Sequence, residues 1–447
     1  MRKQRNKTSF LMMSAALAAI AVFSTALEKP LAEQDNFKGD AAIQFGVSLI
    51  AEGKKTFRYD TFGDEAFWGD TLRMHEVIAG EANGGIGPGV SPSTALSLGL
   101  KVDSEALPQK LKQDIVKGRV DLDDPATTVA LLKLDAVVGA KGFFDSSGKL
   151  ENIGFTCALC HSDVDDSFAP GIGKRLDGWP ARDLHFGDIV ATSPNLEPFQ
   201  NLLGVDRDTV IAVLKSWGPG KFDASLLLDG KAFRPDGQPA ATLIPPAYGL
   251  AGVNLHTYTG WGGVSHWNAF VGNLEMQGQG RFYDPRLADE EKFPIAAANG
   301  MDDVKRAPDE DRVTSKLAGL QMYQLSIPAP RAPEDSYNPA IAQFGEELFN
   351  GKAKCASCHV PPLFTEPGHN IRRPEEIGID SFLADRGPTG GYRTTPLMGA
   401  WARSTGGYYH DGRFTTLNDV VNHYNQALDL NLTNGERQAI VEYINSL

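Results

Sequence analysis

Two short stretches of the sequence, "GFTCALCHSD" (residues 154–163) and "AKCASCHVPP" (residues 353–362), share one unusual pattern. In each stretch two cysteines are separated by two residues, and a histidine follows the second cysteine directly. These are the only four cysteines among the 447 residues of the chain. Every thiol of the protein is therefore used in the same local arrangement.

Three interpretations of the four cysteines are open. Each C-x-x-C pair can form a disulfide if the protein is exported. A shared zinc site is a second interpretation, but such modules separate their pairs by about 15–20 residues, whereas nearly two hundred residues lie between these pairs. The third is covalent c-type haem, in which two thiols add to the porphyrin vinyl groups and the next histidine binds iron.

The complete C-x-x-C-H motifs favour the haem interpretation, because both histidines are present and no cysteine is left over. We therefore expect two covalently bound haem c groups. The expected attachment residues are Cys157 and Cys160 for the first and Cys355 and Cys358 for the second, with His161 and His359 as the iron ligands.

The N-terminal residues 1–26 have the pattern of a secretory signal peptide. A basic stretch is followed by the apolar run from Phe10 to Phe23 and by small residues ending at Ala26. A retained membrane anchor is the alternative. No later segment is long and apolar enough to span a bilayer, so we expect a periplasmic protein without a mature membrane span. The net charge of −13 argues against nucleic-acid binding.

The length of the chain predicts more than one domain. We expect a mainly α fold with long loops, built from two cytochrome c-like domains that arose by tandem duplication. Helices are expected at 124–144, before the first motif, at 206–220 and at 433–447, and the stretch 338–359 is expected to be a helix followed by a short loop into the second motif. The predicted segments are an N-terminal extension (27–130), a first haem domain with an insertion (131–327), a Pro-rich linker (328–340) and a second haem domain (341–447).

An internal repeat supports the duplication. The stretches 259–275 and 405–419 can be aligned so that Trp267 matches His410. Each copy follows a haem motif and a Pro-rich turn, at 244–246 in the first half and 394–396 in the second.

With these motifs and the stretch "YYHDGRFTTLNDVVNHYN" (408–425), residues 130–447 resemble the bacterial di-haem cytochrome c peroxidases and MauG-like enzymes. The resemblance implies two facing haem domains in an oxidoreductase. The haem on His359 would relay electrons from a small cytochrome or cupredoxin to a peroxide-reactive haem on His161. Two alternatives stay open, namely a non-catalytic electron carrier and a MauG-like oxidase of a partner protein.

The resemblance also implies roles for individual residues. The distal ligand of the second haem follows the histidine of the His-Asp-Gly motif by fourteen positions, which is Tyr424 here, with His423 and Met398 as alternatives. Trp267 corresponds to a tryptophan between the haems, and Gln277 to a glutamine ten positions later.

Three further roles known in the family can be assigned less directly to residues of this chain. The family's acid/base glutamate is replaced by Leu287, so peroxidase activity is in doubt, and the nearby carboxylates of Glu275, Asp289 and Glu290 are possible substitutes. A calcium ion between the domains would use Thr405 and the backbone of Gly407. His185 is the best-placed candidate for a removable ligand of the reactive haem.

Overall fold

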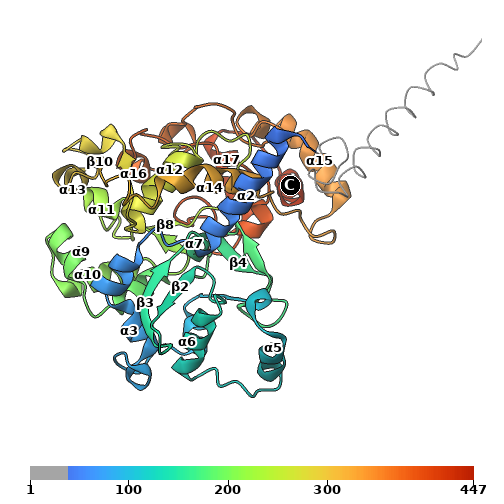
Figure 1. Ribbon diagram of the computed structural model, residues 1–447. Coiled ribbons are helices and arrows are strands. Elements are labelled where there is room, and N and C mark those ends of the chain that lie inside the picture. The colour runs from blue at the N-terminus through green and yellow to red at the C-terminus, as the bar shows by residue number, and fades with distance from the viewer. Residues whose placement is uncertain (1–38) are drawn as a thin grey trace, which may run out of the picture.

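The computed structural model describes residues 39–447 and shows a mainly helical protein (Figure 1). The expected fold class is confirmed at this level. The predicted signal peptide, residues 1–26, lies outside the described part of the chain. Among residues 39–447 no helix combines the length and the apolar character that crossing a membrane requires.

The helices are spread along the whole described chain. The α-helices are α2 (Ala41–Tyr59), α3 (Met74–Ala79), α4 (Pro92–Ser97), α5 (Gln109–Val116), α6 (Pro125–Lys133), α7 (Ala158–His161), α8 (Phe186–Ala191), α9 (Glu197–Leu203), α10 (Arg207–Ser216), α11 (Leu226–Asp229), α12 (Val264–Phe270), α13 (Pro294–Ala298), α14 (Leu317–Ser326), α15 (Pro339–Asn350), α16 (Phe382–Arg386), α17 (Leu417–Ala427) and α18 (Asn434–Ser446). Two π-helical segments are η3 (Ala66–Thr71) and η6 (Val271–Glu275).

The strands form only short two-stranded pairs in the described residues. The antiparallel pairs are β2 (Ala140–Phe144) with β3 (Leu150–Phe155), β4 (Ser162–Val164) with β6 (Arg175–Asp177), β7 (Lys221–Phe222) with β8 (Thr242–Leu243), and β9 (Phe282–Tyr283) with β10 (Asp303–Val304). The parallel pair is β1 (Val102–Asp103) with β5 (Ile172–Gly173).

Three of the expected helices are confirmed, and each begins at a residue that caps it. Asp206 accepts a hydrogen bond from the amide of Thr209 at 2.8 Å at the start of α10. Asn338 caps α15, and Thr433 forms a capping box with Glu436 at the start of α18. Side-chain acceptors at these positions satisfy amide groups that the first helical turn leaves free.

The helix expected at 124–144 forms only in its first half, as α6. The chain then turns, and β2 pairs with β3, which runs directly into the first C-x-x-C-H motif. Gly139 has a positive φ of 79°, and a Cβ atom there would lie 2.1 Å from the Cα of Leu159. The helix has already ended at Lys133, and Asp135 takes a left-handed conformation with a φ of 52°, so the chain leaves the helix before it reaches Gly139 and the hairpin.

Two helix pairs have matching contacts in the two halves of the chain. In Figure 1, α2 crosses beside α14, and α15 lies beside the C-terminal helix α18. A Cβ on Gly53 of α2 would lie 1.9 Å from the carbonyl oxygen of Gly319. A Cβ on Gly345 of α15 would lie 1.9 Å from the carbonyl oxygen of Ala439.

An aromatic contact repeats in the same way, four residues after each glycine. Phe57 meets Tyr323 edge-on with ring centroids 5.5 Å apart, and Phe349 meets Tyr443 edge-on at 5.3 Å. The predicted boundaries assign α2 to an extension separate from the first haem domain. In the structure α2 packs against α14, which belongs to that predicted domain.

Candidate functional site

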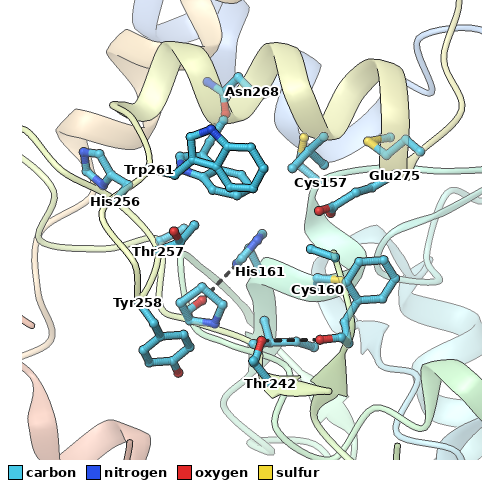
Figure 2. A pocket seen from close by; sticks show the side chains of 18 of the residues that line it. Cys157, Cys160, His161, Thr242, His256, Thr257, Tyr258, Trp261, Asn268 and Glu275 are labelled. Atoms are coloured by element: carbon cyan, nitrogen blue, oxygen red, sulfur yellow. Dashed lines mark hydrogen bonds between the residues drawn. The ribbon is translucent and has the colours of Figure 1, made fainter. Parts of the chain in front are cut away.

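The first C-x-x-C-H motif opens into a cavity with a volume of about 240 Å³. The cavity is lined by Cys157, Cys160 and His161 (Figure 2). The thiols of both cysteines are free. Cys157 directly precedes α7, and the amide of His161 donates to the carbonyl of Cys157 at 3.1 Å. One helical turn thus brings the imidazole beside both thiols.

His161 is oriented by a backbone carbonyl. Its Nδ1 lies 3.1 Å from the carbonyl oxygen of Pro245, in the Pro-rich turn at 244–246. Because this carbonyl accepts only a proton-bearing nitrogen, Nδ1 carries the proton and Nε2 keeps its lone pair. Burial lowers the pKa of His161 to about 4, which keeps the imidazole neutral at ordinary pH.

The segment that follows α12 supplies a carboxyl group to the same cavity. Here the helix widens into the π-helical segment η6, whose last residue is Glu275. Figure 2 shows the Glu275 carboxyl group pointing into the cavity near Cys157 and Cys160. Burial, and the nearby carboxylate of Asp223, raise the pKa of Glu275 to about 8. Local π-helical turns of this kind are frequent at functional sites.

The other two substitutes for the missing glutamate lie elsewhere. Asp289 and Glu290 are exposed, and Asp289 accepts hydrogen bonds from the amides of Glu291 and Lys292. Leu287 is fully buried in an apolar cluster around Phe293. Of the carboxylates considered from the sequence, Glu275 is the one that lines the cavity.

Trp267 lines the cavity and stands edge-on to Trp261, with ring centroids 5.4 Å apart. Its indole nitrogen is buried and has no hydrogen-bond partner within the described chain. Gln277 lies two residues beyond η6, and its side-chain amide donates to the carbonyl of Leu274. The cavity wall includes the neighbours of Gln277 at positions 275 and 276 but not Gln277 itself.

The second motif repeats the geometry of the first. The amide of His359 donates to the carbonyl of Cys355 at 2.9 Å, and its Nδ1 lies 3.0 Å from the carbonyl oxygen of Phe364. Burial lowers the pKa of His359 to about 4. Cys355 packs against the core that holds Phe349, as Cys157 packs against the core that holds Phe57.

The three candidates for the second distal ligand differ in position. Tyr424 is carried by α17 and packs against the same apolar cluster as Cys355. Burial raises the pKa of Tyr424, and the thiols of Cys358 and Cys355 add to the effect. His423 has its Nε2 only 2.8 Å from the carbonyl oxygen of Ile377, and Met398 is 37% exposed.

The residues expected at the calcium site face a guanidinium group. Nη1 of Arg182 lies 3.3 Å from the carbonyl oxygen of Thr405 and 3.4 Å from that of Gly407. Coordination of a cation by these oxygens would require Arg182 to withdraw. No group of three or more His, Cys, Asp or Glu side chains within residues 39–447 is arranged to hold a metal ion.

His185 lies outside the cavity wall. It precedes α8, and its Nδ1 is 3.0 Å from a carboxylate oxygen of Asp188. His256 lines the cavity and is 6% exposed.

Sequence reasoning missed several cavity residues, among them Trp261, Tyr258, Asp223 and Arg393. Asp223 and Arg393 are far from both motifs in sequence. Only the tertiary fold brings them to the first motif, so no local pattern could have indicated them.

The cavity fits a covalently attached porphyrin. Its wall carries two free thiols, an imidazole with a free Nε2, and many apolar side chains. The buried amide nitrogen of Asn268 and the indole nitrogen of Trp267 also lie there without partners inside the described chain. Buried polar groups normally have a partner, so these two donors indicate that a further group belongs in the cavity.

Comparisons with known proteins agree with this chemistry. Cytochrome-c peroxidase IdrP1 of Denitromonas iodatirespirans is 28% identical over 192 residues, which cover 31% of this chain and 51% of the relative. Cytochrome-c peroxidase IdrP2 of Pseudomonas sp. (strain SCT) is 30% identical over 169 residues, covering 28% and 46%. Methylamine utilization protein MauG of Methylorubrum extorquens is 33% identical over 120 residues, covering 25% and 34%.

The chain thus spans about half or less of the length of these curated relatives. No protein-family model matches it. Among solved structures, a chain of Kuenenia stuttgartiensis hydrazine synthase matches at 17% identity over 48% of this chain and 76% of its own, with a TM-score of 0.27. By its partial matches in sequence, the protein is related at the superfamily level to the cytochrome-c peroxidases and MauG.

Proposed function

We propose that the protein is an exported di-haem c oxidoreductase of the peroxidase type. Two haem groups are held through Cys157 and Cys160 and through Cys355 and Cys358, and the first haem is the reactive one. The observation that carries the proposal is the cavity at the first motif, whose wall contains Glu275 together with Cys157, Cys160 and His161. When bound, such groups supply reversible one-electron chemistry and, at an open iron position, a site for peroxide.

The residues of the chain divide the remaining tasks. His161 and His359 offer Nε2 to iron because their Nδ1 protons are engaged by backbone carbonyls. Trp267 lies in the wall of the first cavity and is proposed as the aromatic bridge toward the second half. Tyr424 is proposed as the distal ligand of the second haem. Gln277 helps to fix the end of η6. A calcium ion would be held by oxygens of Thr405 and Gly407 once Arg182 turns away from them.

Glu275 takes the acid/base role that Leu287 cannot fill. A carboxyl group with a raised pKa is protonated at neutral pH and can hand its proton to a departing peroxide oxygen. The apolar side chain of Leu287 is buried away from the cavity. In this proposal the carboxyl group that donates the proton is carried by Glu275 instead of by the residue at position 287. The proton transfer is kept, although the family's sequence pattern is not.

Replacing Glu275 with glutamine tests this role. Glu275→Gln should lower the rate of peroxide reduction by about 10²-fold or more, in the range of general acid–base catalysis. The rate of the unaltered protein should fall as the pH rises through about 8, because the carboxyl group then loses its proton. Glu290→Gln, at an exposed carboxylate, is the control and should leave the rate unchanged. Equal rates in both variants would remove Glu275 from the mechanism.

The haem content tests the proposal as a whole. Denatured protein from an exporting host that matures c-type cytochromes should retain two porphyrins per chain by mass spectrometry. Its ferric EPR spectrum should show one high-spin centre, either as isolated or after half-reduction. Two low-spin centres that ignore peroxide in both states would favour the alternative, a di-haem electron carrier. A MauG-like oxidase would instead oxidise a partner protein when peroxide is added.

A further inference from the structure

Three arginines where the two halves of the chain meet, of which two are buried and one is partly buried, have no carboxylate partner within residues 39–447. Arg182 and Arg403 are 7% and 8% exposed, and Arg393 lines the cavity of the first motif. Within residues 39–447, the hydrogen bonds of these side chains go only to backbone carbonyls. The Nε of Arg182 is buried and has no partner at all in that part of the chain.

Several other arginines of low exposure within residues 39–447 are paired with carboxylates. Ion pairs join Arg58 to Asp177, Arg175 to Asp103, and Arg386 to both Asp223 and Asp229. A buried charge without a counter-charge costs several kcal/mol. The three unpaired guanidinium groups therefore indicate that anions which the chain does not itself supply belong beside them.

The three groups also repel one another. Burial lowers the pKa of Arg393 to about 10, and the positive charge of Arg403 adds to the effect. Burial also lowers the pKa of Arg182, and Arg403 again contributes. A cluster of like charges in the interior needs more than one anion for compensation.

Their hydrogen bonds run crosswise between the halves. Arg182, from the first half, donates to the carbonyls of Thr405 and Gly407 in the second. Arg393, from the second half, donates to the carbonyls of Leu255 and Thr257 in the first. The three arginines thus lie at the junction between the half that contains the first motif and the half that contains the second.

Each arginine is also tied to one of the two motifs. The residue before Arg182, Ala181, donates its amide to the carbonyl of Cys160 at 2.9 Å. Arg393 shares the cavity with Cys160 and His161. Arg403 donates to the carbonyl of Pro396 at 2.8 Å, and the next residue, Leu397, donates its amide to the same Phe364 carbonyl that Nδ1 of His359 faces.

We propose that Arg182, Arg393 and Arg403 bind the propionate carboxylates of the two porphyrins at the junction between the halves. This inference rests on the proposed function, since a c-type haem carries two propionates besides the groups that join the cysteines. Guanidinium groups suit carboxylates because their planar N–H donors match the two oxygens. The pairing compensates the buried charges and holds both macrocycles toward the same junction.

Reduction potentials of the two haems provide the test. Arg393→Gln should lower the midpoint potential of the haem on His161, and Arg403→Gln that of the haem on His359. Loss of a nearby positive charge stabilises the ferric state in each case. Arg393→Lys and Arg403→Lys, which keep the charge, should retain most of the original potential. Arg373→Gln, at an exposed arginine of the second half, is the matched control and should change neither potential.

Each result separates the two proposals. Unchanged potentials in Arg393→Gln and Arg403→Gln, with two porphyrins retained per chain, would overturn the inference and leave the proposed function standing. Fewer than two porphyrins in the unaltered protein would overturn the proposed function itself. A potential that depends on added chloride or acetate would assign the cluster to external anions and also overturn the inference.

If neither glutamine variant folds and accumulates in the cell, the unaltered protein can still test the proposed contacts between arginines and propionates. Redox-induced infrared difference spectra of protein with isotopically labelled propionate carboxylates should show these groups ionised and responding to reduction, at frequencies typical of guanidinium pairing. Frequencies typical of water-exposed propionates would contradict the proposed contacts.

Discussion

At the scale of single residues, the two motif histidines have equivalent surroundings on their Nδ1 side. Each Nδ1 meets a backbone carbonyl, at 3.1 Å for His161 and 3.0 Å for His359. A neutral carbonyl makes an imidazole a weaker donor than a carboxylate partner does. We therefore propose that a functional difference between the two motifs comes from other residues, with Glu275 near the first motif and Tyr424 near the second as the candidates.

Tyr424 is the residue through which the second centre is expected to differ. Tyr424→Phe should convert that haem from low-spin to high-spin or lower its coordination number, because the phenol oxygen is lost while the ring still packs. The ferric EPR and optical spectra report this change. Tyr443→Phe, a buried tyrosine of the same apolar cluster, is the control and should keep the low-spin signal. If the low-spin signal survives in Tyr424→Phe, the distal ligand of the second haem is a residue other than Tyr424.

At the scale of elements, the scaffold of each motif is a pair of crossing helices that approach closely at a small residue. Gly53 meets Gly319 where α2 crosses α14, and Gly345 meets Ala439 where α15 crosses α18. The motif of each half then packs against the phenylalanine four residues after the glycine. The match supports the proposal that the two halves arose by duplication, with α2 as part of the first unit.

Two glycines of α2 provide a matched test of this crossing. Gly53→Ala should lower the free energy of unfolding by about 1–3 kcal/mol, because the new methyl group would overlap the backbone of Gly319. Gly46→Ala, in the same helix, meets no atom within 4 Å and should stabilise the protein by about 0.5–1 kcal/mol. Denaturant unfolding measures both. Equal effects of the two substitutions would show that the crossing is not close in solution.

At the scale of the whole molecule, the second half completes the cavity of the first. Leu383, Gly387 and Arg393 reach its wall from beyond residue 380. Arg386, which is 1% exposed, binds Asp223 and Asp229 of the first half. Because Asp223 also lines the cavity, this buried cluster connects the association of the halves with the surroundings of Glu275.

Breaking the Arg386 cluster should therefore destabilise the protein and disturb the cavity together. Arg386→Gln should cost about 3–5 kcal/mol of unfolding free energy, since two buried carboxylates lose their counter-charge. Arg119→Gln, at a largely exposed ion pair with Asp114, is the control and should cost less than about 1 kcal/mol. A similar small loss from both variants, measured by denaturant unfolding, would show that the buried cluster is not needed for stability.

Local patterns in the sequence were sufficient for the motifs and for the best-capped helices. The C-x-x-C-H spacing places both thiols and the imidazole within one turn, and the caps at Asp206, Asn338 and Thr433 begin the helices expected there. These features depend on neighbours a few residues apart. The expected helix at 124–144 was wrong in its second half, because the chain turns at Asp135, which has a φ of 52°, and then packs Gly139 closely against Leu159.

The sequence by itself determined the chemistry that the chain can offer, namely two thiol pairs, each followed by an imidazole. Only the tertiary structure decided which carboxylate reaches the first motif, that α2 packs against α14, and that three arginines meet without carboxylates. The physical reason is the separation in sequence between the residues that interact. Spacing within one helical turn sets local geometry, whereas burial, charge compensation and cavity walls depend on contacts between segments hundreds of residues apart.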